Sequence, residues 1–373
     1  MLVIASSARM LAQAAKNAGL KPLVIDLFAD LDTQAYAEDF LKIRSLAEAD
    51  LRPAVDIFIG RYAVKHAIYG SGFEYYPESL YYLSDCLIVL GNSPDTFARV
   101  QSKADFFAVL SYLGIPYPDV LFNAPEHTDN WLVKPLQGQG GMGVKPARYE
   151  RSDTSVYWQK HQSGTPQSVL FLADGQVARV MGFNTQWTAQ ASESEAFIFS
   201  GIINNSNLSA NHKIRLTAWL ARLVPEFSLK GLNSMDFIQD GEGVYVLEIN
   251  PRLSASMQLY DCGLLMRHIL ASQGEMRDEV VGQGCVVAYQ IIYAISDAVI
   301  PETFEWPEGC VDLPPPGVIC RKSEPICSII ARHNTPQAVF EQLQRKQQQI
   351  FNQLNTGPTS WNTQRALINF PNL

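Results

Sequence analysis

Short apolar runs alternate with helix-forming stretches in the first part of the chain. Residues 8–18 are rich in helix-forming residues and end at Gly19, a typical helix stop. Four apolar runs have the length and composition of buried strands, and they lie at residues 2–5, 22–28, 56–59 and 86–90. Strands alternating with helices predict a doubly wound parallel sheet. A dinucleotide-binding sheet would carry G-x-G-x-x-G after its first strand, but residues 5–9 read ASSAR, so no Rossmann-type cofactor is expected.

The pattern changes after residue 92. Ser93 and Pro94 are typical N-cap and first-turn residues, and they predict a helix that runs to residue 113 and ends at Gly114. Residues 131–172 read as short strands and turns, and a last helix is expected at 336–354. The apolar stretch 280–300 is interrupted by polar residues and predicts a buried strand, not a membrane span.

Composition excludes several classes of protein. The chain has 373 residues, enough for two or three domains, and its 29 Lys and Arg against 37 Asp and Glu give a net charge of −8. An acidic chain is poorly suited to nucleic acid. The start, MLVIASSARM, has no basic segment or cleavage site of a signal peptide, and the six cysteines form no CxxC pair. These features indicate a cytoplasmic protein with reduced thiols and no membrane partner.

A glycine-rich segment follows the strand near residue 134. It begins at Lys134, ends at Lys145, and carries Gly138, Gly140, Gly141 and Gly143. Pro146 stands where a Rossmann helix would begin, and Val144 stands where a Walker loop would have its lysine. The segment is therefore expected to be a strand–loop–strand. Its glycines would let backbone N–H groups approach a phosphate closely, although a flexible hairpin tip has the same composition.

A second group of polar residues lies in two apolar strands, SMDFIQD and VYVLEIN, joined by a turn at 240–243. Residues two apart in a strand share a face, so Glu248 and Asn250 point the same way, and a hairpin brings Asp236 beside them. Their oxygen atoms are suited to Mg²⁺, which usually completes its coordination with water and nucleotide phosphates. Arg252 follows, with a planar guanidinium suited to a carboxylate or phosphate. An exposed hairpin face is the alternative interpretation.

Taken in order, these segments resemble the ATP-grasp superfamily. The resemblance rests on Lys103 before LGIPYP, on Lys134 before the glycines, on Asp236 before Phe-Ile, and on LEINPR, which ends at Arg252. It implies an α/β fold whose parallel-sheet domain (1–95) precedes linker helices and a small lid subdomain (96–165). A larger α+β subdomain with a mixed or antiparallel sheet (166–280) and a C-terminal segment packed on this core (281–373) would follow. It also implies the roles of the residues. Lys103, Lys134 and the glycines would contact ATP, and Asp236, Glu248 and Asn250 would hold Mg²⁺, with Mn²⁺ as an alternative.

The resemblance further implies that adenine lies beside a hinge strand near Gln159, Lys160 and His161. Family members often have an acid where this chain has Lys160. Many also have an arginine where it has Ser234, and Lys213 or Arg215 is the candidate to replace the phosphate contact of that arginine. Arg252 would be the catalytic group on the substrate side. The histidines at 161, 212 and 268 are more often structural in such settings, and none is assigned as a general base.

The activity implied is ATP-dependent ligation of a carboxylate to an amine through an acyl phosphate. The tail from Asp312 and the run NPRLSAS are similar to a subgroup distantly related to biotin carboxylase, which includes ligases joining glutamate to tyramine in methanofuran- and tetrahydromethanopterin-type C1 cofactor synthesis. Small-molecule substrates and a homodimer are expected. Two alternatives remain: an ATP-dependent carboxylase, against which the absence of Glu-His after NPR argues, and a nucleotide-binding regulatory protein without turnover.

Overall fold

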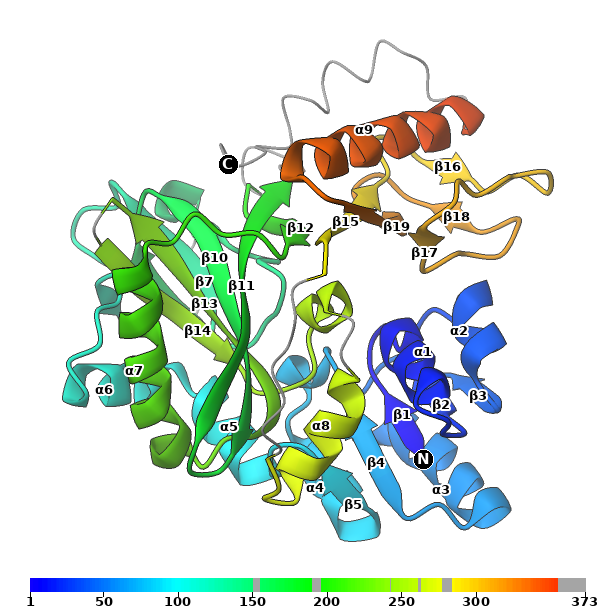
Figure 1. Ribbon diagram of the computed structural model, residues 1–373, viewed down its shortest axis with the longest axis horizontal. Coiled ribbons are helices and arrows are strands. Elements are labelled where there is room, and N and C mark those ends of the chain that lie inside the picture. Colours follow the sequence, from blue (N-terminus) through cyan, green and yellow to red (C-terminus); the bar gives the residue numbers. More distant parts are fainter. Residues whose placement is uncertain (150–154, 190–195, 242, 261–262, 277–283, 355–373) are drawn as a thin grey trace.

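The N-terminal part of the protein is a five-stranded parallel sheet flanked by helices (Figure 1). The computed structural model describes residues 1–149, 155–189, 196–241, 243–260, 263–276 and 284–354. In the strand order β3-β2-β1-β4-β5, the chain first adds strands on one side of β1 and then on the other side, beginning with β4, which is parallel to β1. This arrangement confirms the predicted doubly wound sheet. The strands are β1 (Leu2–Ile4), β2 (Leu23–Asp26), β3 (Asp39–Lys42), β4 (His66–Tyr69) and β5 (Ile88–Leu90), and the helices are α1 (Arg9–Asn17), α2 (Leu31–Tyr36), α3 (Glu48–Tyr62) and α4 (Glu78–Cys86).

Two local predictions were wrong. Residues 56–59 do not form a strand but lie within α3, which buries Leu51, Val55 and Phe58 at helical spacing. A four-residue apolar run fits either element, and here the longer helical period decides. The predicted helix at 94–113 is two helices, α5 (Pro94–Gln101) and α6 (Lys103–Tyr112). Ser102 separates them because its extended backbone ends α5 while its hydroxyl accepts a hydrogen bond from the N–H of Asp105 in α6.

Two further sheets carry the middle and the end of the chain. A four-stranded antiparallel sheet in the order β6-β9-β7-β8 consists of β6 (Val120–Leu121), β7 (Trp131–Pro135), β8 (Lys145–Pro146) and β9 (Val156–Lys160). An eight-stranded antiparallel sheet has the order β14-β13-β10-β11-β12-β15-β19-β17. Its strands are β10 (Thr165–Asp174), β11 (Ala178–Ala189), β12 (Ile198–Ile203), β13 (Lys230–Asp240), β14 (Gly243–Asn250), β15 (Val286–Tyr293), β17 (Cys310–Val311) and β19 (Pro325–His333).

The remaining elements cover these sheets. Helix α7 (Ala210–Phe227) packs its apolar side on the eight-stranded sheet, α8 (Leu264–Ser272) lies between that sheet and the N-terminal sheet, and α9 (Pro336–Gln353) covers the C-terminal strands (Figure 1). A small two-stranded sheet pairs β16 (Ala298–Val299) with β18 (Ile319–Cys320). The short 3-10 helices are η1 (Phe73–Tyr75), η2 (Ala147–Tyr149) and η3 (Ala255–Leu259).

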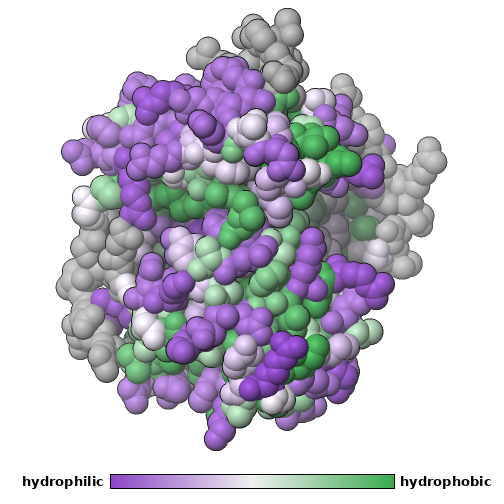
Figure 2. All heavy atoms as spheres, turned by 90° about the vertical axis from the view of Figure 1, so that its right-hand side faces the viewer, coloured by the Kyte–Doolittle hydropathy of each residue, from purple (hydrophilic) through white to green (hydrophobic). Residues whose placement is uncertain are grey.

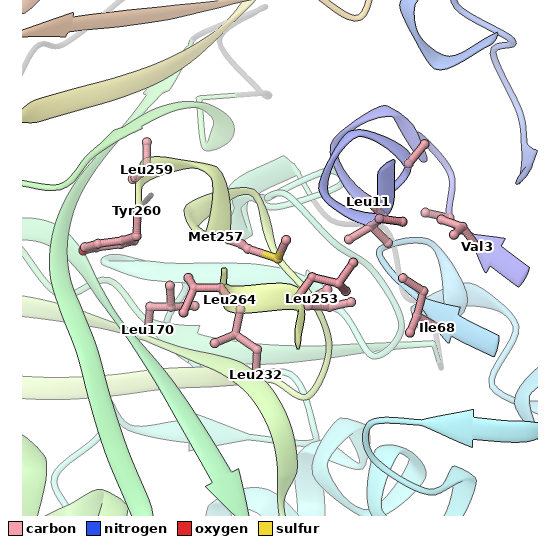
Figure 3. Packing of buried hydrophobic residues seen from close by; sticks show 14 of the residues in the cluster. Val3, Leu11, Ile68, Leu170, Leu232, Leu253, Met257, Leu259, Tyr260 and Leu264 are labelled. Carbon is pink, nitrogen blue, oxygen red and sulfur yellow. The ribbon is translucent and has the colours of Figure 1, made fainter. Parts of the chain in front are cut away.

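One apolar core joins the N-terminal sheet to the eight-stranded sheet. Val3, Leu11 and Ile68 of the former pack toward Leu253 and Met257, which follow β14 (Figure 3). His268 is buried at the same junction, where it bonds the carbonyl of Leu90 and accepts a hydrogen bond from the N–H of Leu232. Burial lowers the pKa of His268 to about 4. This histidine is therefore structural, as expected.

One face of the molecule is mostly polar (Figure 2). Figure 2 looks at the side that lies on the right in Figure 1, and hydrophilic residues cover most of it, with hydrophobic residues gathered in a band between its upper and lower parts. Among the residues that the structure describes, no helix has the length and apolar character needed to cross a membrane.

Candidate active site

The β13–β14 hairpin brings the predicted metal ligands together. Asp236 pairs directly with Glu248 across the two strands, and the register shifts just after Asp236. Asn250 donates a hydrogen bond from Nδ2 to Oδ2 of Asp236 at 3.0 Å, and Gln186 of β11 donates from Nε2 to Oδ1 at 3.1 Å. The two carboxylates and the amide therefore share one face of the sheet, as the strand pattern predicted.

The two carboxylates differ in their affinity for protons. Burial raises the pKa of Asp236 to about 7, and the negative charge of Glu248 adds to this effect. Burial would also raise the pKa of Glu248, but the positive charges of Lys103 and Lys134 outweigh it and leave the pKa of Glu248 below its ordinary value. The site therefore holds one ionised acid and one acid that would ionise fully only when another cation is close.

Both predicted phosphate lysines lie at this face. Lys103 is the first residue of α6, is only 6% exposed, and its Nζ lies 3.2 Å from Oε2 of Glu248. Lys134 is on β7, where its Nζ donates to Oε1 of Gln159 at 2.9 Å. Burial lowers the pKa of Lys134 to about 8. Two buried ammonium groups with few acidic partners form a setting suited to the phosphates of a nucleotide.

The hinge strand β9 contributes one side chain to this group. Gln159 is buried, and its Nε2 has no hydrogen-bond partner, so a donor beside Lys134 is left for a ligand. Lys160 and His161 are not brought into the site through their side chains. Lys160 is 54% exposed and pairs with Asp119 at 3.5 Å, and the His161 ring lies beside Phe197. Their contribution would have to come from the backbone, which here donates to the carbonyls of Asp119 and Asn130.

The glycine loop lies against β12 and the residue before it. The N–H of Phe199 donates to the carbonyl of Gly140 at 2.9 Å. Gly141 has a positive φ of 73°, and a Cβ there would lie 1.9 Å from the carbonyl oxygen of Phe197. Gly143 also has a positive φ, and a Cβ would lie 2.8 Å from the ring of Pro135. The loop therefore requires glycine for close approach as well as for backbone conformation.

Arg252 joins the metal face to the N-terminal sheet. Its NH2 donates to Oδ1 of Asn250 at 3.2 Å, and its Nε donates to Oε1 of Glu74 at 2.8 Å. Glu74 lies in η1 after β4, and its other oxygen accepts a hydrogen bond from the N–H of Gly72 at 2.7 Å. Because both ends of the guanidinium are held, its orientation beside Asn250 is fixed.

The donor set fits a hard divalent cation. Asp236, Glu248 and Asn250 offer the oxygen ligands that Mg²⁺ prefers. Burial raises the pKa of Asp236 and the charge of Glu248 adds to it, and a cation held by both carboxylates would offset the two effects. Within the described part of the chain, no group of three or more His, Cys, Asp or Glu residues is arranged to hold a metal ion. A cation here would thus depend on the amide and on other ligands, such as phosphates.

Three contributors were missed in the sequence: Gln186, Glu74 and Tyr75, whose hydroxyl lies beside Gly138 of the loop. Gln186 sits in an alternating strand without a motif, and Glu74 and Tyr75 are far along the chain from the residues they contact. Lys213, considered as a phosphate contact, instead lies over the ring of Phe183.

Comparisons with known proteins identify the domain that carries these residues. A family model described as "ATP-grasp domain" matches residues 100–256, which include all the residues discussed on α6, β7, β13 and β14. An uncharacterized protein of Methanocaldococcus jannaschii is 21% identical over 269 residues. That match covers 66% of this chain and 64% of the relative, so just under two thirds of the relative's length is matched.

Two solved structures share the fold over nearly the whole chain. Biotin carboxylase of Campylobacter jejuni, solved as a β,γ-ATP complex, has a TM-score of 0.74 at 13% identity, covering 97% of this chain and 96% of its own. The biotin carboxylase domain of Hydrogenobacter thermophilus 2-oxoglutarate carboxylase, a dimer solved with MgADP and bicarbonate, has a TM-score of 0.71 at 13% identity, covering 92% and 89%. At the level of the domain, the prediction of an ATP-grasp enzyme of the ligase type is confirmed. Residues 100–256 of the chain therefore match the ATP-grasp domain, and the chain as a whole shares the fold of the biotin carboxylases.

Proposed function

We propose that this protein is an ATP- and Mg²⁺-dependent ligase that joins a carboxylate to an amine through an acyl phosphate. The observation that carries the proposal is one cluster: Lys103 paired with Glu248, and Arg252 held beside Asn250 on the same hairpin. Lys103, a cation for phosphate, thus pairs with a residue only four positions before Arg252, whose fixed guanidinium suits a second anion. ATP-grasp ligation requires this combination because two anions must be brought together.

In the proposed reaction, the substrate carboxylate attacks the γ-phosphate of ATP, which gives an acyl phosphate and ADP. The amine then displaces phosphate and forms the amide with loss of a proton. Lys103 and Lys134 neutralise the charge of the phosphates, and Gln159 orients Lys134. The glycine loop at 138–143 excludes water that would hydrolyse the acyl phosphate, and Arg252 orients the carboxylate.

Asp236, Glu248 and Asn250 would hold the metal ion. Mg²⁺ held there would supply positive charge to offset that of the phosphates. Mn²⁺ has similar ligand preferences and is proposed as an alternative. Binding of the cation would replace the repulsion between Asp236 and Glu248 by attraction, so it would lower the pKa of Asp236.

The segment after Arg252 supports an amine acceptor over bicarbonate. Residues 253–256 contain no ionisable side chain, and the hydroxyls of Ser254 and Ser256 are buried and hydrogen-bonded to each other at 2.9 Å. A carboxylase would require a base here to deprotonate bicarbonate or its acceptor. The similar biotin carboxylases leave that activity as the principal alternative.

The finer assignment follows the sequence resemblance. We propose glutamate as the carboxylate and an amine such as tyramine as the acceptor, in synthesis of a methanofuran- or tetrahydromethanopterin-type C1 carrier. The same proposal includes a cytoplasmic location, a homodimer and four structural units, at residues 1–95, 96–165, 166–280 and 281–373. The last boundary divides the chain but not the eight-stranded sheet, since β15, β17 and β19 continue it.

The direct test is ADP release with ATP, Mg²⁺ and glutamate, in the presence of single amines including tyramine, and separately with bicarbonate. ADP release that requires both glutamate and an amine, together with an amide product detected by mass spectrometry, would support the ligase. Glu248→Gln is the matched inactive control because it removes the charge and keeps the shape. Bicarbonate-dependent release would reject the proposal in favour of a carboxylase. Tight ATP binding with no release under any condition would favour a regulatory protein.

A further inference from the structure

A second polar cluster lies where the N-terminal sheet meets the C-terminal strands. The first residue of α2 is hydrogen-bonded to the segment that follows β17. The N–H of Leu31 donates to the carbonyl of Leu313 at 2.8 Å. The carboxylate of Asp32 accepts hydrogen bonds from the N–H groups of Asp312 and Leu313 at 2.8 and 3.0 Å. In Figure 1, α2 accordingly lies directly below β17. Two parts of the chain 280 residues apart thus enclose the side chains between them.

Asp30, the residue before α2, is the unexplained member of this cluster. It is only 7% exposed, and among the described residues no donor makes a hydrogen bond to its carboxyl group. Its acidic neighbours all have partners. Asp26 accepts from the N–H of Ala29 at 2.9 Å, and Asp312 accepts from Nε of Arg9 at 2.9 Å. Buried carboxyl groups without a partner are rare because desolvation is costly.

Arg9 does not satisfy Asp30. Besides Asp312, its guanidinium donates from NH1 to Gln13 at 3.0 Å and from NH2 to Gln258 at 2.8 Å. The guanidinium of Arg9 thus donates to Asp312 and to two amides and lies 3.9 Å from Asp32, so none of its hydrogen bonds reaches Asp30. Burial raises the pKa of Asp30 to about 7, and the charges of the neighbouring acids add to this while Arg9 opposes it. The groups that face Asp30 are Arg9 of α1, Asp26 of β2, Asp32 of α2, Asp312 after β17, and Cys320 of β18.

The cluster is connected to the candidate active site through one short segment. Gln258, the partner of Arg9, lies in η3, and this helix begins three residues after Arg252. Arg9, and with it the acidic cluster, is therefore linked through η3 to the residues that follow Arg252.

We propose that Asp30, supported by Asp32 and Asp312, forms a subsite for an ammonium group carried by one of the ligase substrates. An ammonium group is compact and donates up to three hydrogen bonds, so it can supply both the charge and the donor that Asp30 lacks. A metal ion would need more protein ligands than are arranged for one in the described residues. The inference rests on the proposed function only in calling the ligand a ligase substrate.

The test measures binding without ATP, by titration calorimetry at pH 7, with two matched pairs of probes. L-glutamate is compared with glutarate, and tyramine with 4-ethylphenol, because each pair differs only in the ammonium group. We expect at least one ammonium compound to bind at least tenfold more tightly than its partner. Binding should also release up to about half a proton, measured from the dependence of the heat on buffer, as the carboxyl group of Asp30 ionises.

Asp30→Asn should abolish both the preference for the ammonium compound and the proton release. Asp30→Ser, which retains a residue suited to the start of α2, should do the same, and an unchanged circular dichroism spectrum would establish that both variants fold. Asp56→Asn, which changes an acid of α3 outside the cluster, should bind as the unmodified protein does. An ammonium preference that persists in Asp30→Asn, or its absence from the unmodified protein with both pairs, would overturn the inference. Ammonium binding through Asp30 without amide formation would instead overturn only the proposed function.

Discussion

Glu74 and Arg252 form a buried ion pair between residues 178 positions apart in the chain, with Nε 2.8 Å from the carboxylate. Glu74 belongs to the N-terminal sheet region and Arg252 follows the hairpin that carries Asp236 and Glu248. The pair therefore fixes the position of one domain against the catalytic face of another. It also leaves one edge of the guanidinium beside Asn250.

Removing Glu74 should destabilise the protein strongly. Glu74→Ala would leave a guanidinium that is only 9% exposed without its main acceptor, and we expect a loss of about 3–5 kcal/mol in the free energy of unfolding. Glu74→Gln keeps an acceptor and should cost less, about 1–3 kcal/mol. Urea denaturation of each variant gives these differences.

The control for Glu74 is Glu48→Ala, which removes an exposed ion pair with Arg52 on the surface of α3. It should change stability little because exposed pairs are screened by water and salt. A loss for Glu74→Ala no larger than for Glu48→Ala would contradict the assigned role of the buried pair.

The sequence predicted the hairpin well because its information is local. The alternation of β14 places Glu248 and Asn250 on one face, and the short turn leaves few registers that could bring Asp236 opposite. Gln159 and the two lysines were also identified from motifs. Their side chains do meet, as Lys134 with Gln159 and Lys103 with Glu248.

Contacts made by domain docking could not be predicted in this way. Glu74 and Asp30 belong to no motif, and their roles depend on which distant segment packs against them. The strand predicted at residues 56–59 failed for a related reason. The helix α3 extends well beyond this short run, and its burial against the sheet decides the conformation.

The glycine loop offers a matched pair of substitutions. Gly140 and Gly141 have similar positive φ values of 61° and 73°, so alanine is strained at both by about 1–2 kcal/mol. At Gly141 the added Cβ would clash, 1.9 Å from the carbonyl oxygen of Phe197, whereas at Gly140 it would lie in ordinary contact, 4.0 Å from the Cβ of Phe199. Gly141→Ala should therefore weaken ATP binding and ligation much more than Gly140→Ala, measured by calorimetry and ADP release. Equal effects would indicate that the loop does not function in the position seen here.

ATP binding should weaken at alkaline pH. Burial lowers the pKa of Lys134 to about 8, so the free protein carries this charge below pH 8 and loses it above. The phosphates favour the charged form, and the affinity for ATP should be nearly constant up to pH 8 and then fall by up to about tenfold per pH unit. The affinity for ATP stops falling at the pH where Lys134 loses its proton in the ATP complex as well. Lys134→Met should bind ATP more weakly at pH 7 and lose this dependence between pH 8 and 9.5, whereas a retained slope would assign it to another group.

Arg252→Lys separates a group that acts on the substrate from one that binds the nucleotide. Lysine keeps the positive charge but cannot donate to Glu74 and Asn250 at once, so the fixed orientation of the charge is lost. If Arg252 orients the carboxylate and stabilises the charge that develops on the acyl phosphate, amine-dependent ADP release should fall about 100-fold or more. The dissociation constant for ATP should change by no more than about threefold, because the lysines and the glycine loop remain.

The two quantities are measured on the same preparation, by coupled ADP assay and by calorimetry. A loss of ATP affinity as large as the loss of turnover would place Arg252 on the nucleotide instead, and the carboxylate would then need another partner.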